Sequence, residues 1–111
     1  MLKIIEFNDQ KVELRSSAAT RLSYKQVFNR ELQADLKIIQ NDDDFDIMGV
    51  LDPLTRLAYI MHKQAKAEKE MNYDNYTEWL DSMEESFFLE KADEIIETWM
   101  GNKPTSQLKN G

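Results

Sequence analysis

The chain contains no cysteine, only three glycines and two prolines, and a single histidine among its 111 residues. Without cysteine it can form neither a disulfide framework nor a thiolate metal site, which fits a reducing cytosol. Its three widely spaced glycines cannot form a glycine-rich loop around a phosphate. His62 has no second histidine for a metal site and no cysteine or G-x-S-x-G serine to activate. We therefore expect no catalytic residue, no cofactor and no metal, and a protein that is not an enzyme.

Long hydrophobic runs are also missing. No segment approaches the roughly 20 apolar residues of a transmembrane helix. The first ten residues, MLKIIEFNDQ, hold no apolar run typical of a signal peptide. We therefore expect a soluble, intracellular protein that does not bind membranes. The length fits one domain, predicted to span residues 1–102, followed by a flexible tail over residues 103–111.

Basic residues are scarce in two parts of the chain. The net charge is -7, yet residues 1–40 carry seven bases and five acids. Residues 41–52 carry five aspartates and no base, and residues 72–100 carry nine acids against Lys91 alone. Nucleic-acid binding needs a basic footprint, so we expect no nucleic-acid partner. Such acidity fits a basic protein partner, mimicry of a nucleic acid, or solubility alone.

The first third of the chain predicts a hairpin followed by a helix. Near-alternating patterns over residues 2–7 and 11–15 predict two strands, with a turn near Asn8 to Gln10. Ser23 and Gln26 match a capping box at the start of a helix that continues to Gln40. Thr20 and Ser17 are alternative starts for this helix.

A central helix is predicted after an acidic run. Residues 41–46, NDDDFD, lack the glycine and glutamate of a calcium loop, so they read as a loop in which Asp44 or Asp46 caps a helix. Asp52-Pro53 is typical of a helix start, and the apolar stripe that follows extends to Ala65. Residues 45–51 could form a short separate helix before it.

Two further helices complete the predicted fold. The first runs from Asn72, a plausible N-cap, to Phe88, and the second from Leu89 to Met100 before Gly101. The resulting fold class is α+β, mainly α, with an N-terminal β-hairpin followed by four or five helices in one small domain. In the first of these helices the apolar side chains share one face, whose members are Tyr73, Tyr76, Leu80, Met83 and Phe87.

Aromatic residues supply the candidate binding site. Trp79, Phe88 and Trp99 exceed what one core-facing stripe needs, and tryptophan and tyrosine are frequent anchors of protein interfaces. We expect Trp79→Ala to weaken partner binding more than folding. The predicted partner-binding residues are Tyr73, Tyr76, Trp79, Phe88 and Trp99.

The order and spacing of these segments resemble a known family. They are IIEFNDQKVEL, RLSYKQVFNREL, an acidic connector, LTRLAYIMHKQA, NYDNYTEWLDSME and LEKADEIIETWM. This arrangement, over residues 2–100, resembles the tail assembly chaperones of long-tailed (siphovirus-type) bacteriophages and of prophages of Gram-positive bacteria.

The resemblance implies a non-enzymatic function. A protein of this family binds the long, helical, aggregation-prone tape measure protein and keeps it soluble during tail assembly. The resemblance also makes the major tail protein a second candidate partner and leaves a homo-oligomer open. It implies the host bacterial cytoplasm as the location and absence from the mature virion. The alternative drawn from composition is a small acidic regulator or inhibitor, including a nucleic-acid mimic.

Overall fold

The N-terminal hairpin forms as predicted. The computed structural model describes residues 2–40 and 47–101. Strand β1 (Leu2–Phe7) pairs antiparallel with β2 (Gln10–Arg15), with Phe7 opposite Gln10. Asn8 and Asp9 form the two-residue turn with φ angles of 48° and 65°, the geometry that suits the twist of the two strands.

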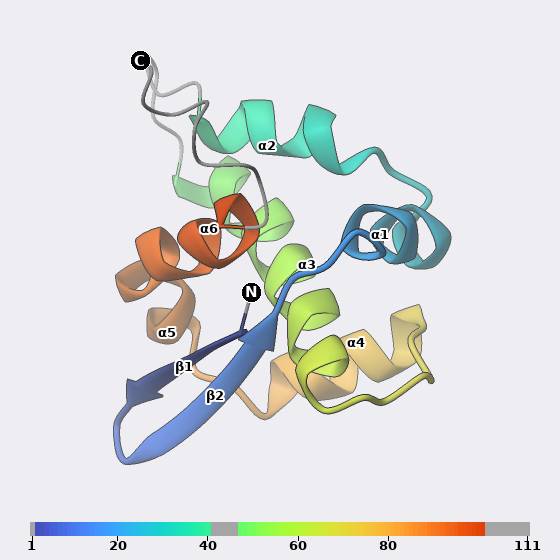
Figure 1. The fold of residues 1–111 in the computed structure, drawn as a ribbon. Helices are drawn as coiled ribbons and strands as arrows, with labels where there is room; N and C mark the ends of the chain where they lie inside the picture. The colour runs from blue at the N-terminus through green and yellow to red at the C-terminus, as the bar shows by residue number, and fades with distance from the viewer. Residues whose placement is uncertain (1, 41–46, 102–111) are drawn as a thin grey trace.

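Six helices follow the hairpin within the described residues, so the predicted class, α+β and mainly α, is confirmed. They are α1 (Thr20–Phe28), α2 (Leu32–Gln40), α3 (Ile47–Ala65), α4 (Tyr73–Asp81), α5 (Glu85–Glu90) and α6 (Ala92–Met100). Figure 1 shows α3 running through the middle of the molecule, with α1 on one side and α5 and α6 on the other. Helix α3 packs against β2 and against each of the other five helices.

The core surrounds the middle of α3. Five consecutive α3 residues have no exposed surface: Leu57, Ala58, Tyr59, Ile60 and Met61. The inward face of the hairpin adds Ile5, Val12 and Leu14, and α6 adds Ile95. Since consecutive residues point in all directions around a helix, α3 is enclosed on every side here.

The helix predicted from Ser23 to Gln40 is divided in two. Helix α1 begins at Thr20, the alternative start, so the capping box at Ser23 is wrong and Ser23 lies inside the helix. The Ser17 backbone N–H donates to Thr20 Oγ1 (2.9 Å), which fixes the earlier start. Helix α1 ends because Asn29 adopts the left-handed conformation (φ 56°), which asparagine tolerates well.

The helix start predicted at Asp52-Pro53 is also wrong. Pro53 lies within α3, which begins at Ile47. A proline inside a helix lacks the N–H for one backbone hydrogen bond. Burial of the neighbouring side chains Leu51 and Leu54 offsets this loss, since they are 8% and 1% exposed. The predicted acidic loop at 41–46 and the tail at 103–111 lie outside the described residues.

The helix predicted over residues 72–88 is interrupted. Helix α4 ends at Asp81, where Ser82 Oγ donates to the Trp79 carbonyl (2.6 Å), and α5 begins at Glu85. The helix predicted over residues 89–100 is likewise shorter, because Leu89 belongs to α5 and α6 starts at Ala92. The breaks at Asn29 and after Asp81 each add a helix, which raises the number above the predicted four or five.

Candidate functional site

The five predicted partner-binding residues do not share one surface. Tyr73 is 62% exposed and Trp79 is partly buried. The other three are core residues: Tyr76, Phe88 and Trp99 are 6%, 2% and 7% exposed. Phe88 and Trp99, which were predicted to exceed the needs of one core-facing stripe, are therefore needed for the core. The break between α4 and α5 explains the burial of Phe88, because it allows Phe87 and Phe88 to pack inward together. Their ring centroids lie 5.1 Å apart.

Trp79 packs mainly against other rings. Its centroid lies 5.3 Å from the stacked ring of His62, 5.9 Å from Tyr59 and 5.7 Å from Phe88. These contacts join α4 to α3 and α5. They give Trp79 a packing role in addition to the binding role predicted for it.

His62 holds the C-terminal half of α3 to the hairpin. Its Nδ1 lies 2.9 Å from the backbone carbonyl oxygen of Glu13. Since a carbonyl only accepts, Nδ1 carries the proton of this hydrogen bond. Burial lowers the pKa of His62 below its ordinary value, although the bond to Glu13 opposes the shift. The histidine is thus a structural residue at the edge of the core.

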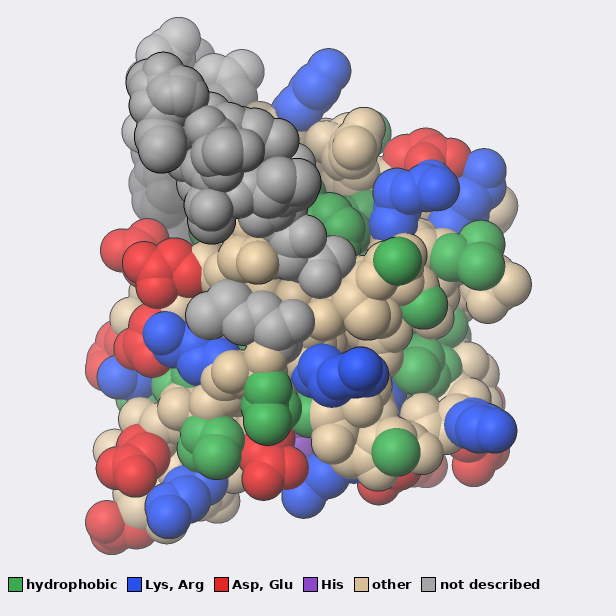
Figure 2. Space-filling view, in the orientation of Figure 1, with side chains coloured by type: hydrophobic (Ala, Val, Ile, Leu, Met, Phe, Trp, Pro, Cys, Tyr) green, Lys and Arg blue, Asp and Glu red, His purple; other side chains and the backbone are tan. Residues whose placement is uncertain are grey.

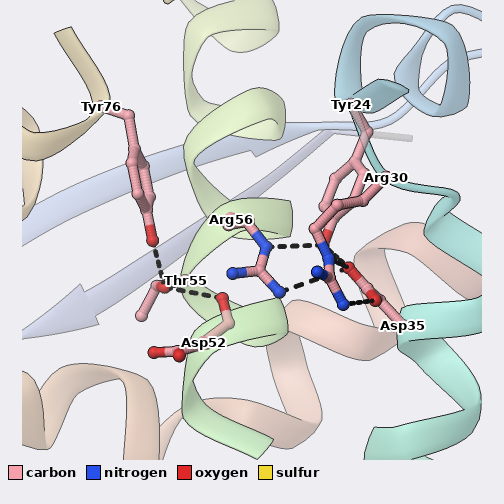
Figure 3. A network of polar contacts seen from close by, with 7 residues as sticks. All are labelled: Tyr24, Arg30, Asp35, Asp52, Thr55, Arg56 and Tyr76. Carbon is pink, nitrogen blue, oxygen red and sulfur yellow. Dashed lines mark hydrogen bonds and ion pairs between the residues drawn. The ribbon is translucent and has the colours of Figure 1, made fainter. Parts of the chain in front are cut away.

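Tyr76 fixes α4 on α3, and Asn72 caps the start of α4. The Tyr76 hydroxyl lies 2.8 Å from Thr55 Oγ1, which also donates to the Asp52 carbonyl at 2.9 Å (Figure 3). Asn72 is the N-cap of α4, as predicted, and its Oδ1 accepts from the Asn75 N–H (2.8 Å). Helix α4 is therefore held in a defined position along α3.

A buried polar cluster joins α1, α2 and α3 (Figure 3). Arg30 donates to both oxygens of Asp35 at 2.8 Å, and the Tyr24 hydroxyl donates to Oδ2 at 2.5 Å. Arg56 donates to the Tyr24 hydroxyl (3.1 Å) and to Asp35 Oδ2 (3.3 Å). Asp35 is 2% exposed, and both its oxygens already accept hydrogen bonds. The cluster stabilises the corner between the helices and leaves no carboxylate oxygen for a substrate.

The pKa values of this cluster follow from the same contacts. Burial alone would raise the pKa of Asp35, but hydrogen bonds from Arg30 and Tyr24 outweigh it and hold the pKa below the ordinary value. Burial, with the bond to Asp35, raises the pKa of Tyr24. The carboxylate is thus charged and the phenol neutral at neutral pH, as a structural ion cluster requires.

The residues from 73 to 90 carry six exposed carboxylates and no basic side chain. These carboxylates are Asp74, Glu78, Asp81, Glu84, Glu85 and Glu90; we call them the α4–α5 acidic surface. None of the six forms an ion pair with a described residue. Several acids elsewhere are paired, namely Glu13, Glu31, Asp35, Glu68, Glu94 and Glu97. Others among the described residues are not, namely Glu6, Asp9, Asp52, Glu70 and Asp93. The face in Figure 2 shows both acidic and basic side chains.

An open groove of about 250 Å³ lies between α3 and the α4–α5 segment. Its lining, which defines the α3–α5 groove, consists of Leu51, Asp52, Thr55, Leu80, Met83, Glu85 and Phe88. Leu80 and Met83 are partly buried, whereas Asp52 and Glu85 are exposed. The groove therefore has apolar walls and carboxylates at its rim. A larger hollow beside the hairpin turn is lined only by consecutive residues 6–11, so it brings no distant side chains together.

Sequence reasoning missed this groove. It placed Leu80 and Met83 on the buried stripe of one continuous helix, where they would have been covered. The only signal of the break was Ser82, whose side chain can bond to a helix-terminal carbonyl.

No family model, no curated protein and no solved structure matches this chain. Within residues 2–40 and 47–101, no group of three or more metal-ligating side chains gathers. No helix in the same part of the chain is both long and apolar enough to cross a membrane.

Proposed function

We propose that this protein is a phage tail assembly chaperone that binds the tape measure protein and keeps it soluble during tail morphogenesis. The observation that carries the proposal is the α3–α5 groove beside an acidic surface without described ion-pair partners. The similarity of segment order to tail assembly chaperones supports the choice of client. The major tail protein is a second candidate partner.

A chaperone for a helical client must cover apolar stripes and keep the complex in solution. Helix-in-groove contacts cover such stripes, and the apolar walls Leu80 and Met83 provide a surface for them. Exposed carboxylates such as Glu78 and Asp81 repel other copies of the complex, which opposes aggregation. This function places the protein in the host bacterial cytoplasm and leaves it out of the mature virion.

The test is co-expression with the tape measure protein of the same phage or prophage. We expect a larger soluble fraction of the client and a complex that elutes together from a size-exclusion column. An unrelated acidic protein of similar size serves as the control. Equal insolubility of the client with and without this protein, and no complex, would refute the proposal.

The unpaired carboxylates also favour a second candidate function, an acidic regulator that mimics a nucleic acid. Such a protein would occupy a basic site, and its binding would fall steeply between about 50 and 200 mM salt. Binding through the groove would lose less affinity over the same range of salt, because salt does not screen apolar contacts. The salt dependence of any complex therefore distinguishes the two functions.

A further inference from the structure

We infer that the α3–α5 groove binds a short amphipathic helix whose apolar side chains are flanked by lysine or arginine. The inference deepens the proposed function and rests on it only in assuming that the protein binds a partner segment. It names the site and the chemistry of that segment.

The size of the groove fits one or two apolar side chains. A cavity of about 150 Å³ accommodates a benzene molecule. A groove of about 250 Å³ therefore has room for a second anchor of similar size. Side chains three or four positions apart on a helix lie about 5–6 Å from each other, so two neighbouring anchors can enter together. Leu80 and Met83 line the groove from the α4–α5 segment, and Leu51 lines it from α3.

The charges around the groove select the flanks of the segment. Asp52 approaches from α3 and Glu85 from α5, and neither forms an ion pair with a described residue. The remaining carboxylates of the α4–α5 acidic surface add to this negative potential. Helix α4 also ends at Asp81, next to the groove, and the C-terminus of a helix carries partial negative charge. An acidic segment or a nucleic acid would be repelled here, whereas a lysine on either side of the anchors would be attracted.

Two synthetic peptides test the inference. The first is a helical peptide of about 18 residues with leucines at i, i+3 and i+7 and lysines beside them. The second has glutamate in place of each lysine. Isothermal titration calorimetry should show that the lysine peptide binds at least about tenfold more tightly than the glutamate peptide. Equal affinity of the two peptides, or no binding of the lysine peptide, would overturn the inference.

Two variants with matched controls locate the site. Leu80→Gln removes an apolar wall, and its control Leu22→Gln changes a leucine that is 52% exposed outside the groove. Glu85→Lys reverses a rim charge, and its control Asp93→Lys reverses an exposed charge outside it. We expect each groove variant to weaken binding of the lysine peptide at least about fivefold, and each control to leave it unchanged.

The variants also separate this inference from the proposed function. Because Glu85 is exposed, Glu85→Lys should keep the fold, which the melting temperature verifies even if Leu80→Gln unfolds. If folded Glu85→Lys and Leu80→Gln still bind the tape measure protein normally, the groove is not the binding site, although the proposed function remains supported. If the lysine peptide binds at the groove but no complex with the tape measure protein forms, the groove is a binding site and the proposed function is wrong. Self-association of the chain that the groove variants abolish would make a second copy the occupant and overturn the inference.

Discussion

Replacing Asp35 by asparagine should unfold the corner between α1, α2 and α3 more easily than any surface change. The substitution keeps the shape of the side chain and removes its charge. The asparagine NH2 only donates, so one of the two hydrogen bonds from Arg30 is lost and the other becomes weaker. The change also leaves the Arg56 guanidinium, whose side chain is 16% exposed, without its counter-charge.

The expected magnitude follows from the burial of the two partners. Breaking a buried ion pair from one side costs about 3–5 kcal/mol. Arg30 is 47% exposed, so water compensates part of its loss, and we expect a decrease of about 3 kcal/mol in the free energy of unfolding. For a domain of this size about 1 kcal/mol corresponds to a shift of roughly 4 °C, so the melting temperature should fall by about 12 °C.

Thermal unfolding followed by circular dichroism at pH 7 measures this change. The matched control is Glu31→Gln, because Glu31 pairs with Lys25 and Arg21 at the surface beside the same corner. The control should melt close to the wild type. A fall in melting temperature for Asp35→Asn no larger than that of the control would refute the reasoning.

The difference in stability between the wild type and Asp35→Asn should depend on pH. Because the pKa of Asp35 is lowered in the folded state, its contribution to stability is present above the unfolded pKa of about 3.9 and is lost as the pH falls below that value. The difference in melting temperature between wild type and Asp35→Asn should therefore be constant from pH 7 to about pH 5 and shrink below about pH 4. A difference that stays constant at pH 3 would contradict it.

Three further predictions concern other parts of the fold. Because the pKa of His62 is lowered by burial, stability should decline as the pH falls below about 6.5, and His62→Gln should remove part of this decline in pH-dependent melting. Ala67 has a φ of 58°, so Ala67→Gly should raise the free energy of unfolding by about 0.5–1 kcal/mol in urea titrations; a decrease would show that no strain is relieved. Trp79→Ala should lower stability by about 2–3 kcal/mol, with Trp79→Phe losing less, while the remaining folded protein binds the lysine peptide normally, since Trp79 does not line the groove.

The fold class could be predicted from local patterns, but the helix ends could not. The hairpin followed from alternation and a two-residue turn, both of which are local. The break at Asn29 depends on Arg30 reaching Asp35 and on Tyr24 and Arg56 meeting the same carboxylate, which are contacts between separate helices. Apolar spacing continued through this break, so periodicity alone gave one helix.

The candidate site was less predictable than the fold. Composition identified the acidic segment correctly, since charge needs no knowledge of packing. Composition could not show which aromatic side chains belong to the hydrophobic core. Phe88 and Trp99 complete the core around α3, and only the fold reveals that the partly buried Leu80 and Met83 form apolar walls of the groove.

The enclosure of α3 sets an order in which the molecule should open. Amide protons in its middle can exchange with solvent only when the surrounding helices have separated, so residues 57–61 should exchange at the rate of global unfolding. Helix α4 lies on the outside of this arrangement and holds α3 largely through Tyr76 and Trp79. Its amides should therefore exchange earlier, through local opening. A partner bound to the α3–α5 groove would slow that opening, and the protection would report binding without any label on the partner.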